Sequence, residues 1–303
     1  MTNGKVPVTF LNAHSGRKGV LGLLAFPDML TRDDIFCRFF TYIEGNWGKA
    51  DFDFDGKALT YKTGPGEYRG WWILGKNGEI AEVSAQGIQR EQIPGAGLNI
   101  EQPYGYVEMI RNIAGELYVC GYGRQVYKRS EDGWTSISDE ILTRDSATGF
   151  FDIDGSDPRH IYAVGWQGEI YFYDGNRWHK DDSPTNSHLA SVCCADDGSV
   201  WIAGNKGVVL HGRFNQWTQI SSEDMTGNWY SVAVYEGKAY LAGNQSLAVV
   251  EGDEIVPLDV GLDRAITTYK LSVKEGLLWS VGEKDILMFD GEKWQEIEHP
   301  DNT

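Results

Sequence analysis

Side chains that could act as acids, bases or nucleophiles are present, but they follow no catalytic pattern. The six histidines are His14, His160, His179, His188, His211 and His299, scattered along 303 residues. No H-E-x-x-H, G-x-S-x-G or G-x-x-x-x-G-K-[ST] motif occurs. We therefore predict no catalytic residue and no cofactor. A histidine could still meet carboxylates from distant segments in the folded chain, so a hydrolase or lyase acting on a glycan remains an alternative.

One acidic run has the opening of a calcium-binding loop. The segment DFDFDG at Asp51–Gly56 matches the first positions of an EF-hand loop. Position seven is Lys57, and position twelve is Lys62, where a bidentate Glu is required. The alternation of Phe and Asp instead indicates a strand edge with Asp facing water. We predict no metal site here.

The four cysteines give no sign of a metal site either. Cys37, Cys120, Cys193 and Cys194 contain no C-x-x-C pair and no matching His spacing. Cys120 and Cys193 lie in apolar strand patterns, which favours buried thiols. The segment MTNGKVPVTF is unlike a secretion signal, and no apolar run reaches the roughly 18 residues of a membrane helix. We expect a cytoplasmic protein.

A five-residue phrase recurs along the chain: an apolar residue, an aromatic residue, two mostly apolar residues and a glycine. Its copies end 46, 44, 39, 39 and 39 residues apart. An aromatic residue stands three positions before each glycine, as Trp201 does before Gly204. Regular spacing of this length indicates a repeat architecture. The six phrase glycines are Gly75, Gly121, Gly165, Gly204, Gly243 and Gly282.

Each repeat divides into four short strands. Residues 189–220 contain LASVCC, VWIAG, VVLHG and WTQI, separated by turns rich in Gly, Asn and Asp. Four strands in about 40 residues are typical of a propeller blade. Large aromatic residues at fixed positions fill the space between adjacent sheets, so we assign them to the core. A tryptophan recurs at the fourth strand, as Trp134, Trp178, Trp217 and Trp294.

The N-terminal segment echoes the repeat, because YIEGNW ends at Trp47 as the other third hairpins end at tryptophan. We predict a single all-β domain over residues 1–303, a β-propeller of seven four-stranded blades. Residues 1–53 form an irregular N-terminal blade, and residues 54–303 form six regular blades. The alternative is six blades plus an N-terminal appendage.

The phrase ADDGSVWIAGNKGVVLHGRFNQW resembles the propeller repeats of bacterial two-component regulators, which read approximately D-x-x-G-x-x-W-x-G-T-x-x-G-L. More loosely, it is similar to the YVTN/BNR-like propeller superfamily. The resemblance covers residues 55–297 as repeats. It implies a blade architecture in a bacterial protein and little about activity, since this fold carries many functions.

Binding residues are expected in loops, because packing occupies the strands. Loops between the second and third strands of each blade lie on the same face as the connections between blades, which we call the loop face. Trp166 is surplus to the repeat, since Tyr162 already supplies its aromatic residue. Aromatic residues beside Arg, Lys and Asn are typical of recognition surfaces. The predicted binding residues are Tyr122, Arg124, Trp166, Gln167, Asp181, Asp182, Lys206, Asp224, Trp229 and Tyr230.

The chain is strongly acidic, with 27 Lys and Arg against 44 Asp and Glu and a formal net charge of −17. Such a surface repels nucleic acid and anionic membranes and attracts a cation or a basic protein. The acids of the connections between blades should concentrate this charge on the loop face. They are Asp51, Asp53, Asp55, Glu140, Asp145, Asp181, Asp182, Glu223, Asp224, Asp259 and Asp263.

These features favour a non-enzymatic binding scaffold that engages a basic protein partner through its loop face. Small size, acidity and missing catalytic groups suit an immunity or antitoxin-type protein that neutralises a basic toxin. A sugar-binding lectin using Trp166 and Trp229 is a further alternative. Against it stands the difference between the loops of successive blades, because a lectin of this architecture would repeat its pockets.

Overall fold

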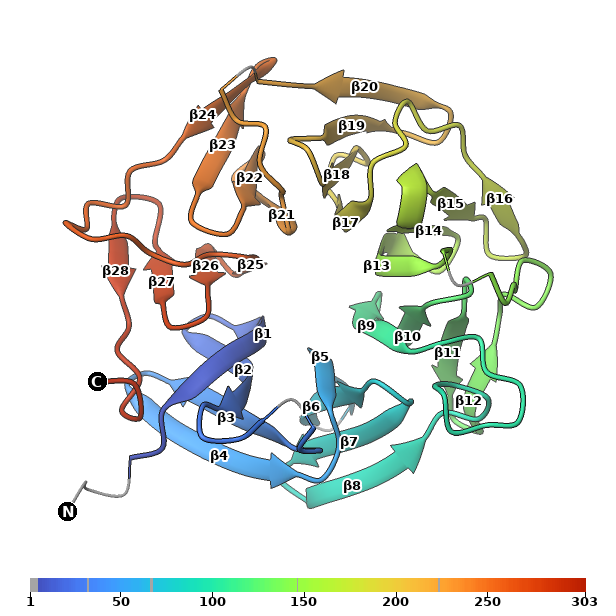
Figure 1. The fold of residues 1–303 in the computed structure, drawn as a ribbon, viewed down its shortest axis with the longest axis horizontal. Helices are drawn as coiled ribbons and strands as arrows, with labels where there is room; N and C mark the ends of the chain where they lie inside the picture. Colours follow the sequence, from blue (N-terminus) through green and yellow to red (C-terminus); the bar gives the residue numbers. More distant parts are fainter. Residues whose placement is uncertain (1–4, 32, 66–67, 146, 223) are drawn as a thin grey trace.

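The chain forms a closed ring of seven blades around a central channel (Figure 1). The computed structural model describes residues 5–303, except for residues 32, 66–67, 146 and 223. Each blade is a four-stranded antiparallel sheet whose strands follow the chain from the channel outward. The prediction of an all-β propeller with seven blades is confirmed, and the alternative of six blades is wrong.

The first four blades run from the N-terminus to the middle of the chain. Blade 1 comprises β1 (Val8–Arg17), β2 (Val20–Pro27), β3 (Cys37–Ile43) and β4 (Asn46–Phe52). Blade 2 comprises β5 (Gly56–Thr63), β6 (Arg69–Gly75), β7 (Glu79–Ser84) and β8 (Gly87–Gln92). Blade 3 comprises β9 (Val107–Ile113), β10 (Glu116–Gly121), β11 (Val126–Ser130) and β12 (Gly133–Ser136). Blade 4 comprises β13 (Phe150–Asp157), β14 (His160–Gly165), β15 (Ile170–Tyr173) and β16 (Trp178–Lys180).

The last three blades have shorter strands. Blade 5 comprises β17 (Leu189–Cys194), β18 (Val200–Gly204), β19 (Val209–Arg213) and β20 (Gln216–Ile220). Blade 6 comprises β21 (Ser231–Tyr235), β22 (Lys238–Ala242), β23 (Leu247–Glu251) and β24 (Glu254–Pro257). Blade 7 comprises β25 (Lys270–Lys274), β26 (Leu277–Val281), β27 (Ile286–Phe289) and β28 (Trp294–Glu296). A 3-10 turn, η2 (Trp166–Gly168), follows β14.

In four of the six repeated phrases, the terminal glycine makes room for backbone that enters the same blade. A Cβ atom on Gly165 would clash with the carbonyl oxygen of Gly149. On Gly204 it would meet the carbonyl oxygen of His188, and Gly121 and Gly282 have equivalent contacts. The repeat keeps glycine at these positions because the incoming segment passes too close for any side chain.

Neighbouring inner strands are joined around the whole channel by hydrogen bonds that involve side chains. The Val192 N–H donates to Asp152 at 3.1 Å, and the Leu271 N–H donates to the Ser231 hydroxyl at 3.1 Å. These bonds satisfy buried polar groups and fix each blade against the next. The remaining five junctions are Asn12–Lys57, Thr60–Asn112, Arg111–Asp152, Ser191–Val232 and Ser272–Ser15.

Three of the outer tryptophans bond their blade to the one before it. In three blades the indole N–H of the fourth-strand tryptophan donates across the gap to the preceding blade or to the connection that leaves it. The rings therefore fill the space between adjacent sheets, as predicted for core residues. Their indole N–H groups also fix the orientation of one blade relative to the one before it. The pairs are Trp134 to Glu91 at 2.8 Å, Trp178 to the Ile137 carbonyl at 2.9 Å, and Trp217 to Asp181 at 2.9 Å.

The C-terminal segment closes the ring against blade 1. His299 is buried, with its ring centroid 4.3 Å from that of Phe40 and 4.5 Å from that of Trp47. The Val8 N–H donates to the Asn302 side chain at 2.9 Å. Figure 1 shows the two ends of the chain beside the same blade. Trp47 thus contacts residues of the other end of the sequence.

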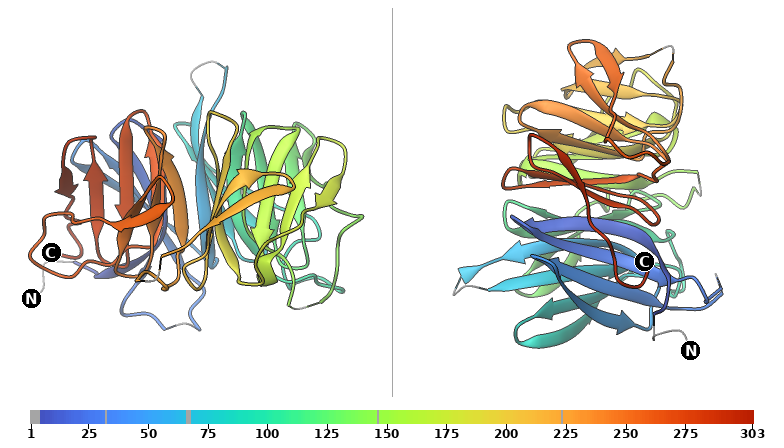
Figure 2. Two further views of the ribbon diagram at one scale, coloured as in Figure 1. Left: turned by 90° about the horizontal axis from the view of Figure 1, so that it is seen from above. Right: turned by 90° about the vertical axis from the view of Figure 1, so that its left-hand side faces the viewer.

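The two faces of the ring are built differently. The loop face carries the connections between blades and the turns between second and third strands. The opposite face, which we call the hairpin face, carries the remaining turns. Figure 2 shows the β2–β3 loop and the β5–β6 hairpin projecting from opposite faces.

Cys37 and Cys120 are buried and Cys193 and Cys194 are half-buried, and all four are free thiols. No helix in the part of the chain that the structure describes is long and apolar enough to cross a membrane.

Candidate functional site

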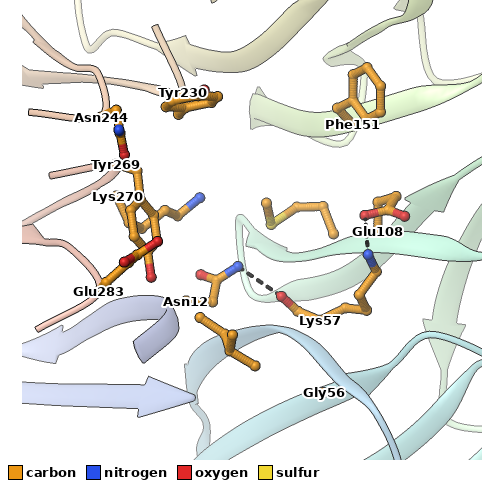
Figure 3. A pocket seen from close by; sticks show the side chains of 12 residues that line it. Asn12, Gly56, Lys57, Glu108, Phe151, Tyr230, Asn244, Tyr269, Lys270 and Glu283 are labelled. Carbon is orange, nitrogen blue, oxygen red and sulfur yellow. Dashed lines mark hydrogen bonds and ion pairs between the residues drawn. The ribbon is translucent and has the colours of Figure 1, made fainter. Parts of the chain in front are cut away.

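A cavity of about 620 Å³ lies at the loop-face mouth of the channel. Its walls come from the first residues of the inner strands and from the turns beside them. Figure 3 shows Tyr230 and Phe151 on one side and a set of charged side chains on the other. The lining residues are Leu11, Asn12, Gly56, Lys57, Glu108, Met109, Phe151, Tyr230, Asn244, Tyr269, Lys270 and Glu283.

The charges in this cavity balance. Lys57 pairs with Glu108 at 2.8 Å, and burial raises the pKa of that glutamate. Lys270 extends into the cavity (Figure 3), and burial lowers its pKa to about 8, with repulsion from Arg111 adding to the effect. No histidine is among the lining residues, and no group of metal-binding side chains occurs among the described residues. A ligand or a partner side chain that enters the cavity would meet hydrogen-bonding groups and paired charges.

An aromatic cluster borders the cavity where blades 3, 4 and 5 meet. It consists of Tyr122, Phe151, Trp166 and His188. Ring centroids of Trp166 and His188 lie 4.6 Å apart, and those of Phe151 and Trp166 lie 5.3 Å apart. The ring centroids of Tyr122 and Trp166 lie 5.9 Å apart. The structure thus brings together two predicted binding residues, Tyr122 and Trp166, with two that the sequence did not reveal.

The cluster is held rigidly. Trp166 is half-buried, and its indole nitrogen is buried without a hydrogen-bond partner among the described residues. The Gln167 N–H donates to Nδ1 of His188 at 3.0 Å, which fixes that ring against the indole. Preorganised aromatic surface of this kind loses little conformational entropy when a partner binds.

Three predicted residues lie in turns between second and third strands and adopt a left-handed backbone, Gln167 and Lys206 two residues after their phrase glycine and Arg124 three residues after its own. Arg124, Gln167 and Lys206 have positive φ angles of 60°, 51° and 59°, each beside a glycine of the same hand. Gln167 and Lys206 are exposed. Arg124 instead pairs with Glu169 of the next blade at 2.5 Å, so its guanidinium joins blades 3 and 4.

Trp229 and Tyr230 are neighbours in sequence but lie in different environments. Trp229 is 2% exposed and packs in the core between blades 5 and 6. Tyr230 is 41% exposed at the cavity mouth (Figure 3). Only Tyr230 of this pair is accessible to a partner on the loop face.

The acids of the loop face fall into two groups. Asp181 is 2% exposed and accepts hydrogen bonds from the Asn215 N–H and the Trp217 indole, both at 2.9 Å. Asp182 and Asp224 are exposed. Glu223 lies outside the described residues. Several other predicted acids are in ion pairs, namely Asp51 with Arg38, Asp53 with Arg90 and Asp55 with Lys76.

Apolar residues on the loop face are a feature that the sequence prediction missed. Met29 and Ile35 of the β2–β3 loop are 77% and 67% exposed. Leu11, Leu98 and Tyr230 also lie on this face, so it holds five of the seven exposed large apolar side chains among the described residues. The signal was present as the apolar residues Met29, Leu30, Ile35 and Phe36 in the segment PDMLTRDDIF, which belongs to no strand pattern.

Comparison with known proteins identifies a relative of this chain. The chain is 36% identical over 230 residues to immune protein Tsi7 of Pseudomonas aeruginosa, a match that covers 75% of each protein. This chain belongs to the Tsi7 family. The Tsi7 family is a family of immunity proteins, so the predicted immunity function and bacterial character are confirmed, and the partner is a protein.

Solved structures that resemble this member of the Tsi7 family support the fold alone. YCF48 bound to a D1 peptide matches with a TM-score of 0.66 and 15% identity over 94% of each chain. Sqt1 from Chaetomium thermophilum matches with a TM-score of 0.65 and 14% identity, over 99% of this chain and 85% of its own. No protein-family profile matches, so the likeness of the repeats to the YVTN/BNR-like superfamily stays a prediction.

Proposed function

We propose that this chain neutralises a toxin by docking it on the loop face, over the mouth of the central channel. The carrying observation is the gathering of exposed apolar side chains on that face. Met29 and Ile35 lie in the β2–β3 loop of blade 1 and Leu98 lies in the connection between blades 2 and 3, on the same face as the aromatic cluster of blades 3 to 5. Interfaces are commonly anchored by a few apolar and aromatic residues within a polar surround.

The charge of the chain supports a basic toxin. The exposed acids Asp182 and Asp224 have no ion pair among the described residues, and they lie in the connections between blades. A net charge of −17 attracts a cationic protein over several ångströms and orients it before contact. Four thiols without a disulfide suit a reducing compartment, and we place the encounter in the cytoplasm.

Neutralisation by this route requires only occlusion. A ring of packed sheets changes shape little on binding. A toxin whose active site is covered by the loop face loses access to its own substrate. This mode needs no catalytic group from the propeller. It relies on tight docking by apolar anchors, with charge setting the rate of encounter.

Growth protection tests the docking face. The toxin is identified by affinity pull-down from the native host and then expressed with and without the chain, and survival is counted. The double variant M29D/I35D places two carboxylates in the apolar contact, and should weaken toxin binding at least about 100-fold by calorimetry and abolish protection.

The matched control is I43D/I88D, which alters two exposed isoleucines of the hairpin face, 40% and 50% exposed. This variant should protect cells as well as the wild type does. Loss of protection in the control, with retention in M29D/I35D, would place the toxin on the wrong face and overturn the proposed docking mode.

A further inference from the structure

A second cavity, of about 380 Å³, lies at the other end of the channel on the hairpin face. Three cations line it: Arg17 at the end of β1, Arg69 at the start of β6, and Lys274 at the end of β25. They belong to blades 1, 2 and 7, which are consecutive around the ring. The positive charges therefore converge across the junction where the ring closes.

These cations are not neutralised by neighbouring acids. None of Arg17, Arg69 and Lys274 forms a salt bridge within the residues that the structure describes. Glu275 is the single carboxylate of the lining, and it accepts a hydrogen bond from the Lys18 N–H at 2.8 Å. The lining carries three positive charges against one negative charge.

The positive character continues into the channel. Burial and, to a smaller extent, the charges of Arg111, Lys270 and Lys274 together lower the pKa of His14, a lining residue, to about 3. The three cations add to the effect of burial in keeping this ring neutral. An anion entering from the hairpin face would therefore be attracted along the cavity.

The surroundings limit the size of that anion. Acidic residues occupy the turns of blades 4 to 7 on the same face, including Asp157, Asp174, Asp197, Glu236 and Asp290. A basic cavity within an acidic surface of net charge −17 admits a small anion and repels a long polyanion such as nucleic acid.

We propose that the hairpin-face cavity binds a small phosphate-bearing anion, held by Arg17, Arg69 and Lys274. Two guanidinium groups offer paired donors that match phosphate oxygens, and the lysine adds a point charge. A bound phosphate group would connect blade 1 to blade 7, and so stabilise the closed ring by mass action. This site is independent of toxin docking on the loop face.

Titration with inorganic pyrophosphate tests the proposal. Calorimetry at constant ionic strength should show saturable binding to one site and a rise in Tm relative to chloride. The variants R17Q and R69Q should each weaken binding about tenfold, since a charge-assisted hydrogen bond contributes about 1.5–3 kcal/mol. Both side chains are exposed, so the variants should keep the wild-type circular dichroism spectrum.

The control is R159Q, which removes an exposed arginine from a hairpin-face turn of blade 4 and changes the net charge equally. It should bind pyrophosphate within about twofold of the wild type, because phosphate attraction that depends on total charge alone would affect all three variants alike. Equal weakening in R159Q would overturn the proposal. Citrate binding as tightly as pyrophosphate would overturn its assignment to phosphate.

Discussion

His299 is enclosed by the rings of Phe10, Phe40 and Trp47, and its burial has a consequence for acid stability. Burial lowers its pKa from 6.5 to about 4. In the unfolded chain His299 therefore takes up a proton near pH 6.5, whereas in the folded chain it does so only near pH 4. Stability contributed by the neutral ring is therefore present above pH 6.5 and lost as the pH falls toward 4.

We expect the free energy of unfolding to fall by about 2–3 kcal/mol between pH 7 and pH 4.5 through this residue, on the relation of 1.36 kcal/mol per pKa unit. Urea unfolding at the two pH values measures the difference. The variant H299Q removes the titrating group and should reduce that difference, whatever its effect on stability at pH 7. A difference of the same size in H299Q would assign acid sensitivity to other groups.

At the scale of single residues, the sequence alone predicted part of the candidate site. Trp166 and Tyr122 were predicted because they are aromatic residues beyond those the repeat requires. Phe151 was missed because it stands in the strand pattern FFDID, where an aromatic residue reads as core. The different environments of Trp229 and Tyr230 could not be predicted, since they depend on the direction in which the chain enters blade 6.

At the scale of the element, Asp181 and Asp182 follow β16 side by side and act differently. Asp181 joins blade 4 to the fourth strand of blade 5 through the Trp217 indole. Its removal takes the buried acceptor away from the indole N–H of half-buried Trp217 and from the Asn215 backbone N–H, and each lost hydrogen bond costs free energy. Asp182 is exposed and contributes no such bond among the described residues.

The substitution D181A should lower the free energy of unfolding by about 2–3 kcal/mol, the cost of losing two hydrogen bonds to a buried carboxylate. The neighbouring substitution D182A makes the same change of charge and should stay within about 0.5 kcal/mol of the wild type, as exposed substitutions do. Chemical denaturation of both variants decides the matter. Equal loss in the two would show that charge alone, and not the indole bond, is responsible.

Elements were the most predictable level, because strand pattern and turn chemistry are local. The phrase glycines, the aromatic residues before them and the fourth-strand tryptophans identified the regular blades. Blade 1 was harder, since its strands are longer and its β2–β3 loop interrupts the period. That same loop carries Met29 and Ile35, the two most exposed large apolar side chains among the described residues. The least regular blade therefore supplies the most accessible apolar surface.

For the whole molecule, the net charge of −17 predicts how association responds to salt. Attraction of a basic toxin accelerates encounter at low ionic strength, and screening removes that gain. The association rate constant should fall about tenfold or more between 50 mM and 500 mM NaCl. The dissociation rate constant should change little, because apolar contacts set it.

Stopped-flow fluorescence or surface plasmon resonance measures both rate constants. The variant D182N/D224N should reduce the salt dependence while leaving the fold intact, since both residues are exposed. An association rate constant that is indifferent to salt would contradict the basic character of the partner.

Closure of the ring by residues 299–303 also sets an order of events during synthesis. Residues 299–303 follow all seven blades in the sequence, so Phe40 and Trp47 of the first blade lack their contact with His299 until the other six blades have been made. A polypeptide that stops early keeps this apolar surface exposed and becomes a target for proteases. Cellular quality control would thereby discard incomplete copies, and only finished molecules would accumulate to guard the cell.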